Sequence, residues 1–270
     1  MIRRKEGFSL VELLIVIAVI AVLAAVIFPT FAAAKRRSRV ASCQSNLRQI
    51  YSAFELYLQD WDECYPNTGD PYLWMGRRWR WPLKQYMSLA AQQTPGDPLT
   101  SQGGRAGVLL CPDDPLAPTQ WEGTSYAYSM SFYVSAEDIN DMTGIQQTWS
   151  DRTPCTSRRK GDVVFPAQKV LLTEWLSNHE PPRVGFGSWE GGRNYIFADG
   201  HSAYLKAKQI KPANDGWPDV NLTRDGLRGQ VGLVLLDFCG LFPVFFSVFV
   251  HRSLLSGSSG RRAATLPRRS

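Results

Sequence analysis

Residues 5–31 read KEGFSLVELLIVIAVIAVLAAVIFPTF, and this stretch decides how the rest of the chain is arranged. Residues 8–28 carry a single charge, the carboxylate of Glu12. At a rise of about 1.5 Å per residue, a helix over these residues is about 31 Å long, which matches the hydrocarbon core of a bilayer. Pro29 ends the apolar run. The sequence therefore predicts a membrane-spanning helix over residues 8–29 with one acid near its start.

The preceding leader, MIRRKEG, is basic and ends in Gly7. A secretory signal peptide normally has a shorter apolar core that is followed by a cleavage site between small residues. Here the polar break comes before the apolar run, so a cut after Gly7 leaves the whole helix on the mature chain. Basic residues flank the segment on both sides, so charge alone does not orient it in the membrane.

The run GFSLVELLIVIAVIAVLAA resembles the cleavage signal of type IV pilins and of the pseudopilins of type II secretion systems. The resemblance implies that a prepilin peptidase cuts between Gly7 and Phe8 on the cytoplasmic side. It also implies that the new amino terminus is methylated, so that Phe8 becomes N-methylphenylalanine. Glu12 is then the fifth residue of the mature chain, where that family has a glutamate.

A carboxylate such as Glu12 is costly in hydrocarbon unless a cation lies beside it. In a filament, the amino group of Phe8 of a neighbouring subunit supplies that cation, and the pair sets the register between subunits. The alternative is that Glu12 reaches the headgroups from a position near the interface. Pro29 has two interpretations as well: it loosens the helix during assembly, or it marks the exit from the membrane.

A second helical pattern covers residues 30–65. Apolar side chains recur there at steps of three and four residues, which predicts one apolar stripe that packs on a sheet. The stripe consists of Val40, Cys43, Leu47, Ile50, Phe54, Tyr57, Leu58 and Trp61. Residues 8–63 are thus expected to form one long helix, half in lipid and half amphipathic.

Residues 66–225 are expected to form a globular head. Short apolar runs between Pro, Gly and Asp predict strands at residues 108–111, 125–133, 169–175, 195–197 and 202–205. Residues 79–89 are expected to form a short helix. The predicted fold class is α+β, a long amino-terminal helix packed on a small antiparallel sheet, as in pilins. The 9 Trp, 10 Tyr and 13 Phe of the 270-residue chain are enough for a sizeable core.

A second resemblance lies in GSWEGGRNYIFADGHSAYL, residues 187–205. It is similar to the signature of a large group of bacterial pilin-like proteins with an H-x9-DG motif. Trp189 stands where that group has its first histidine. The resemblance covers most of residues 1–215. The matching residues are Gly191, Gly192, Asn194, Tyr195, Phe197, Ala198, Asp199, Gly200 and His201.

The Asp199-Gly200 pair predicts a hairpin turn of type I′, and Asn194 and His201 are assigned to the same turn motif. The alternative is a metal site, since Asp199 with Asp113 and Asp114 offers the oxygen ligands that Ca²⁺ prefers. Some pseudopilins bind calcium in this part of the head. No cofactor other than this calcium is expected, and the sequence has no P-loop, dinucleotide or serine-hydrolase motif.

The five cysteines include no C-x-x-C pair, so a zinc ribbon is not expected. Outside the cytoplasm, Cys64, Cys111 and Cys155 can supply one disulfide, and pairing among these and Cys43 is left open. The alternative is that they are small buried thiols.

The tail, residues 226–270, contains an apolar run at 231–250 followed by an arginine-rich end. Three interpretations are open for it: a second membrane segment, a buried strand of the head, or a frameshifted translation.

Together these features predict a non-enzymatic structural subunit of a type IV pilin-like filament, most simply a type II secretion pseudopilin. It is expected in the inner membrane, with a single amino-terminal pass and the head in the periplasm. The expected partners are the prepilin peptidase, other pilin or pseudopilin subunits and the inner membrane. Nucleic acid is not expected, because the net charge of +6 lies in clusters beside apolar runs.

Two other functions are open to a chain with these features. The first is a membrane-anchored binding module for carbohydrate or another substrate, which uses the signal only as an anchor. The second is an anchored hydrolase that uses Asp199 and His201. The sequence does not separate a secretion pseudopilin from a pilin of a pilus or of a DNA-uptake system.

Overall fold

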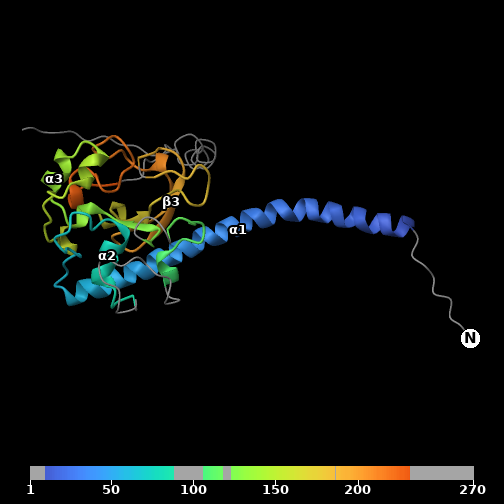
Figure 1. The fold of residues 1–270 in the computed structure, drawn as a ribbon, viewed down its shortest axis with the longest axis horizontal. Helices are drawn as coiled ribbons and strands as arrows, with labels where there is room; N and C mark the ends of the chain where they lie inside the picture. The colour runs from blue at the N-terminus through green and yellow to red at the C-terminus, as the bar shows by residue number, and fades with distance from the viewer. Residues whose placement is uncertain (1–9, 88–105, 118–122, 186, 232–270) are drawn as a thin grey trace, which may run out of the picture. The chain divides into compact units, whose positions relative to one another are not determined.

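The computed structural model describes residues 10–87, 106–117, 123–185 and 187–231. Its longest element is helix α1, Leu10–Asp60, a single helix of 51 residues. Figure 1 shows α1 running from one end beneath the head to a long segment that extends away from it. The predicted long helix is therefore present, with an exposed apolar half and a packed half in one continuous element.

The packed half of α1 begins at Cys43, its first buried residue. From there, buried residues recur at helical spacing, as the apolar stripe predicted: Cys43, Leu47, Ile50, Ala53, Phe54, Tyr57 and Leu58. The two ends of the predicted stripe are exceptions. Val40 is only half-buried, and Trp61 lies beyond the end of the helix, where it is 55% exposed and stacks on the ring of Tyr57.

The end of α1 is set by two acidic residues that follow it. Asp62 and Glu63 adopt left-handed backbone conformations, with φ of 50° and 59°. The N–H of Glu63 donates to the carbonyl of Leu58 at 2.8 Å, which closes the last turn of the helix in the manner of a C-cap.

The head is built on a four-stranded antiparallel sheet in the order β1-β2-β3-β4. The fold class is α+β, as predicted, because consecutive strands are neighbours and α1 contacts β3 and β4. The strands are β1 (Tyr126–Tyr128), β2 (Val170–Glu174), β3 (Gly192–Phe197) and β4 (Ser202–Lys206). The shorter helices are α2 (Gly76–Leu83) and α3 (Ala136–Asp141), with short 3₁₀ turns between them.

Two apolar cores enclose the sheet. The larger one joins the packed half of α1 to one face, where Leu47, Ile50 and Phe54 meet Leu172 and Ile196. The smaller one lies behind Val170, Tyr195 and Phe197 and is covered by Ile210, Val220 and Val231. The alternation of Tyr195, Ile196 and Phe197 between the two cores follows from the two-residue period of a strand.

Two predicted elements of the head were wrong in kind or extent. Residues 108–111 are not a strand: η1, Ala106–Leu109, is a 3₁₀ turn there, and the N–H of Leu110 bonds back to the carbonyl of Gly107. The long strand at 125–133 is only β1, because the chain turns into the 3₁₀ helix η3, Met130–Phe132.

The head extends beyond residue 225. Leu227 and Val231 are buried, and the N–H of Val231 donates to the carbonyl of Gln168 at 2.9 Å. The start of the predicted tail therefore belongs to the head. The rest of the tail lies outside the described residues.

Candidate functional site

The first half of α1 is apolar and largely exposed. Large apolar side chains from Leu10 to Phe31 are between 47% and 74% exposed. This half is long and apolar enough to cross a membrane, by length and composition alone. Soluble proteins rarely leave so large an apolar surface uncovered, and such a surface marks contact with lipid or with other helices.

Glu12 lies in the first described turn of α1, on this apolar half. Its side chain is exposed, so a neighbouring molecule can reach it. Gly7 and Phe8, the predicted cleavage and methylation positions, lie outside the described residues. The geometry therefore places the carboxylate near the end of the helix that the predicted cut would expose.

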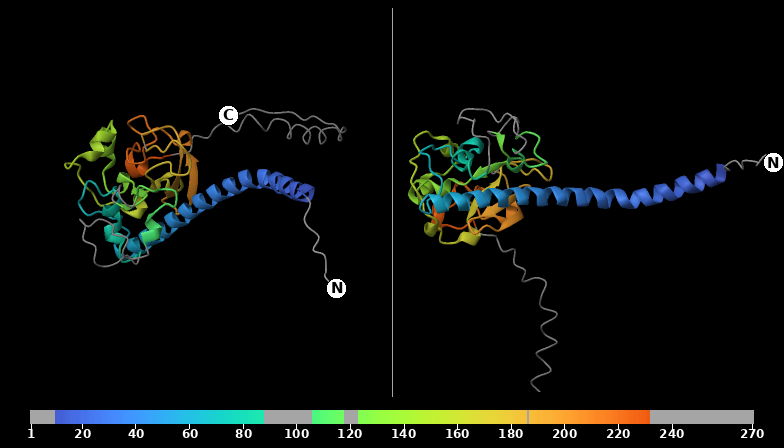
Figure 2. Two further views of the ribbon diagram at one scale, coloured as in Figure 1. Left: turned by 45° about the vertical axis from the view of Figure 1, so that its right-hand side comes forward. Right: turned by 90° about the horizontal axis from the view of Figure 1, so that it is seen from below.

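Pro29 lies inside α1 and does not end it. Proline removes one main-chain donor from the helix, and the hydroxyl of the following Thr30 donates to the carbonyl of Ile27 at 2.8 Å. Figure 2 shows the helix continuing through this region with a gentle curve. An exit from the membrane here would therefore occur without a break in the helix.

Comparison with known proteins points to the same half of α1. Residues 2–28 match the family model of the prokaryotic N-terminal methylation motif. The chain carries a type IV pilin signal. This finding accounts for the leader, the apolar run and Glu12 together.

The chain is similar to proteins of type IV pili over about a fifth of its length. The type IV major pilin protein PilA of Myxococcus xanthus is 37% identical over 59 residues, 22% of this chain and 27% of PilA. The type IV wide pilus major component PilA4 of Thermus thermophilus is 43% identical over 58 residues, 22% of this chain and 44% of PilA4.

The type IV major fimbrial protein FimA of Dichelobacter nodosus is 39% identical over 64 residues, 23% of this chain and 40% of FimA. The chain thus spans less than half the length of each of these three relatives. No solved structure matches it.

The Asp199-Gly200 pair lies in the turn between β3 and β4. The N–H of Gly200 donates to the carbonyl of Phe197 at 2.9 Å, and Gly200 has a φ of +88°. The predicted type I′ turn is wrong, because Asp199 does not have the positive φ that this turn requires. The pattern is a three-residue loop with glycine in the left-handed position.

Asn194 does not belong to this turn. It lies within β3 and is buried, with its main-chain N–H donating to Glu174 Oε2 at 2.7 Å. His201 does follow the turn: its Nδ1 lies 2.6 Å from Asp199 Oδ1, and its ring stacks on Phe197. Both Asp199 and His201 are partly exposed at the tip of a hairpin.

The three carboxylates proposed for calcium are not brought together. Asp113 pairs with Arg39 of α1 and with His179. The turn that carries Asp199 packs on Tyr51, which lies twelve residues, or about 18 Å, after Arg39 along α1. Asp114 is used locally, since its Oδ1 accepts the N–H groups of Leu116 and Ala117. The predicted set Asp113, Asp114 and Asp199 was therefore wrong as a single site.

A buried polar cluster was missed. His179 Nε2 lies 3.0 Å from Glu174 Oε1, and His179 Nδ1 lies 2.9 Å from Asp113 Oδ2. Burial alone would lower the pKa of His179, but the hydrogen bond and the charge of Glu174 raise that pKa. No spacing in the sequence indicated this cluster, because its members come from two separate loops and the end of β2.

Proposed function

We propose that this protein is a structural subunit of a type IV pilin-like filament, processed by a prepilin peptidase and assembled through the apolar half of α1. The peptidase cuts after Gly7 and methylates Phe8 in this proposal. The head then lies outside the cytoplasmic membrane, and the chain has no catalytic role. The pilin signal at residues 2–28 supports processing by this route.

The single observation that carries the proposal is the division of α1 into an exposed apolar half and a buried half. Moving one large apolar side chain out of water is worth about 1.5–3 kcal/mol, and the exposed half carries more than a dozen of them. Lipid covers this surface before assembly, and helices of neighbouring subunits cover it afterwards. A head packed on the other half stays folded during that exchange.

Glu12 gives the assembly its register. In a bundle of apolar helices, a carboxylate is tolerated where an opposite charge lies beside it. The amino terminus created at Phe8 is a cation four residues before Glu12, too near in its own helix to mark a register between chains. The amino terminus of a neighbouring subunit is therefore the partner that we propose for Glu12.

Within this class we propose a pseudopilin of a type II secretion system, of the H-x9-DG pilin-like group. The support is the matching signature along β3 and its turn, where Asn194, Asp199 and His201 occur in the order of that group. Deleting the gene distinguishes this from a pilus subunit. Loss of secreted enzymes with normal surface pili supports the pseudopilin, and loss of pili with normal secretion contradicts it.

The test of assembly compares Glu12→Gln with Asp60→Asn in cells that contain the prepilin peptidase. Both variants remove one carboxylate from α1, but Asp60 is exposed at the opposite end of the helix. We expect cross-linked oligomers from wild type and from Asp60→Asn, and at least a tenfold loss from Glu12→Gln. Equal oligomer yields from all three proteins would contradict the role of Glu12.

A further inference from the structure

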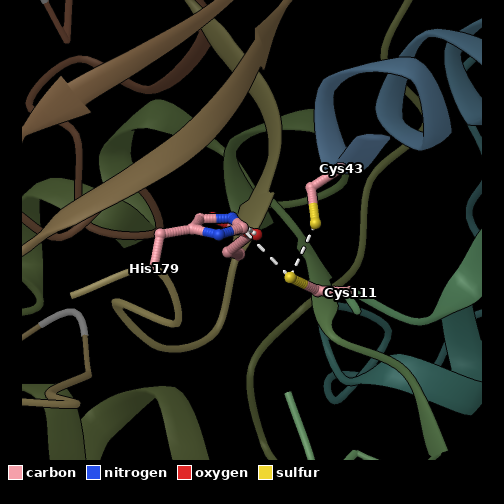
Figure 3. Close-up of side chains that lie close together, drawn as sticks. Cys43, Cys111 and His179 are labelled. Carbon is pink, nitrogen blue, oxygen red and sulfur yellow. Dashed lines mark hydrogen bonds and ion pairs between the residues drawn. The ribbon is translucent and has the colours of Figure 1, made fainter. Parts of the chain in front are cut away.

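Cys43 and Cys111 meet where α1 enters the head. Cys43 is the first buried residue of the helix. Cys111 lies in the loop just after η1, the 3₁₀ turn that contacts α1. Both side chains are almost fully buried. Figure 3 shows the two sulfur atoms facing each other, with the ring of His179 on the other side of Cys111.

The distance between the two sulfur atoms is 2.6 Å. Non-bonded heavy atoms of this kind are normally roughly 3.5 Å or more apart, so two separate thiols do not fit this geometry. We infer that Cys43 and Cys111 form a disulfide bond in the mature protein, and that this bond fastens the head to the assembly helix.

A metal ion is the competing explanation, because Cys43, Cys111, Glu174 and His179 place one ligand atom each within 4.8 Å of one another. Two thiolates on one tetrahedral zinc ion lie about 3.8 Å apart, given a Zn–S distance of about 2.3 Å. The observed sulfur separation is much shorter. Glu174 and His179 also pair with each other, and His179 Nε2 lies 3.6 Å from Cys111 Sγ, so Cys43 Sγ is the nearer partner of Cys111.

The other described cysteines lack such a neighbour. Cys64 lies beside Arg159 in an isolated bridge, and Cys155 lies beside Val134 in another. Their sulfur atoms contact main-chain carbonyls two residues away, those of Asp62 and Thr153. The expected pairing among Cys64, Cys111 and Cys155 is therefore replaced by Cys43 with Cys111, and Cys64 and Cys155 serve as controls.

The bond requires an oxidant, and only this part of the inference rests on the proposed function. Outside the cytoplasm, an oxidised thiol–disulfide oxidoreductase supplies it. One cysteine thiolate attacks the disulfide of the oxidoreductase and forms a mixed disulfide. The second cysteine thiolate then displaces the oxidoreductase, which leaves as a dithiol that has taken up the two protons and two electrons. Because both sulfur atoms end up buried, the exchange occurs before the head closes over α1.

The disulfide lies where a force on the apolar half of α1 is transmitted to the head. Any pull on the apolar half of α1 reaches the head through the residues just after the basic stretch at 35–39, and Cys43 is the first of these to be buried. A covalent link at that point prevents the helix from peeling away from η1 and the sheet.

The test is a tryptic map of the full-length protein from membranes, alkylated without reduction. The four cysteines that the structure describes fall on four separate peptides: 40–48 with Cys43, 106–152 with Cys111, 49–77 with Cys64 and 153–158 with Cys155. We expect peptides 40–48 and 106–152 joined, lighter by two hydrogens, and the other two alkylated. Alkylation of both Cys43 and Cys111 would overturn the inference, and so would a link from Cys111 to Cys64 or Cys155.

Two further measurements separate the alternatives. The zinc content of the same sample is measured as well. Bound zinc, together with alkylation of Cys43 and Cys111 only after a chelator is added, would show a metal site in place of the disulfide. Peptide 8–35 with a methylated amino terminus tests the filament pathway independently. A chain with the disulfide but without processing after Gly7 would support the disulfide and contradict the proposed function. A processed chain in which Cys43 and Cys111 are alkylated would support the proposed function and contradict the disulfide.

Variants add a second readout. Cys43→Ser, Cys111→Ser and the double variant are expected to lower the Tm by the same several degrees, because each removes the same bond. Cys155→Ser is the matched control and leaves the Tm unchanged. Additive losses from the two single variants would show independent packing roles and contradict a shared bond.

Discussion

Gly200 shows how one residue connects the hairpin to the assembly helix. Its φ of +88° is open to glycine, and a Cβ at this position would lie 2.7 Å from the ring of Tyr51 on α1. The hydroxyl of Tyr51 donates to the carbonyl of Ala198 at 3.2 Å, in the same turn. The Asp-Gly turn of the signature therefore serves to dock the β3–β4 hairpin on the helix.

Replacing Gly200 by alanine is expected to destabilise the head more than the same change at Gly69. Both glycines have a positive φ, but Gly69 has open space around it. We expect a loss of about 1 kcal/mol at Gly69 and about 1–3 kcal/mol more at Gly200, where the ring of Tyr51 must move. Urea unfolding of the two variants measures the difference, and equal losses would show that the turn does not press on Tyr51.

Asp219 predicts a pH dependence of stability. It is buried, and burial raises its pKa to about 7, although its Oδ1 accepts the N–H of Asn221 at 2.8 Å. A carboxyl group with a raised pKa in the folded state binds its proton more tightly there than in the unfolded chain. Its contribution to stability is thus largest below about pH 4 and is lost as the pH rises to about 7.

The variant Asp219→Asn isolates that contribution. We expect it to be more stable than wild type at pH 8 by more than about 1 kcal/mol, with the advantage shrinking toward pH 4. Unfolding curves of both proteins across this range measure the difference. A constant difference between the two proteins at all pH values would contradict a titration of Asp219.

At the scale of elements, α1 was the most predictable part of the chain. The apolar run and the stripe from Cys43 to Leu58 each repeat one signal over many residues, so the helix and its buried face followed from the pattern. The strands β2, β3 and β4 were also found in the sequence. Residues 108–111 were not, because a short apolar run does not tell a strand from a 3₁₀ turn that makes its hydrogen bonds locally.

The two halves of α1 are expected to respond differently to truncation. Phe54→Ala removes a fully buried ring that contacts Trp79 and Tyr128, and we expect a loss of about 3–5 kcal/mol in the unfolding of the head. Val22→Ala lies on the exposed half and is expected to leave that stability unchanged while weakening oligomers. Denaturation in detergent and cross-linking in membranes provide the two readouts.

The contrary result is as clear. If Val22→Ala destabilised the head as much as Phe54→Ala, the apolar half of α1 would be part of the folding core, and the division of the helix into assembly and packing halves would fail.

At the scale of the whole molecule, the cluster of Cys43, Cys111 and His179 depends on contacts between segments that are far apart in the sequence. Cys43 and Cys111 are 68 positions apart, and His179 comes from a third segment. The sequence contained these residues, but nothing in their spacing showed that the fold brings them together. The pilin signal, by contrast, is contiguous and was therefore recognisable from residues 2–28 alone.

Reduction of the whole protein provides a prediction at this scale. A bond that closes a loop of this length is expected to contribute about 4 kcal/mol by limiting the unfolded chain. Wild type unfolded with and without a reductant should differ by about that amount, and the Cys43→Ser variant should show no difference. A reductant effect that persists in Cys43→Ser would place the sensitive bond elsewhere in the chain.

The most direct test of the central claim is the mass of the amino-terminal peptide of the membrane-extracted protein, with and without the prepilin peptidase. Entry into the filament pathway predicts a chain that begins at methylated Phe8 when the peptidase is present and at Met1 when it is absent. A chain that keeps residues 1–7 in both cases, or one cut beyond the apolar half of α1, would contradict the account. Glu12 would then have no neighbouring amino terminus to pair with.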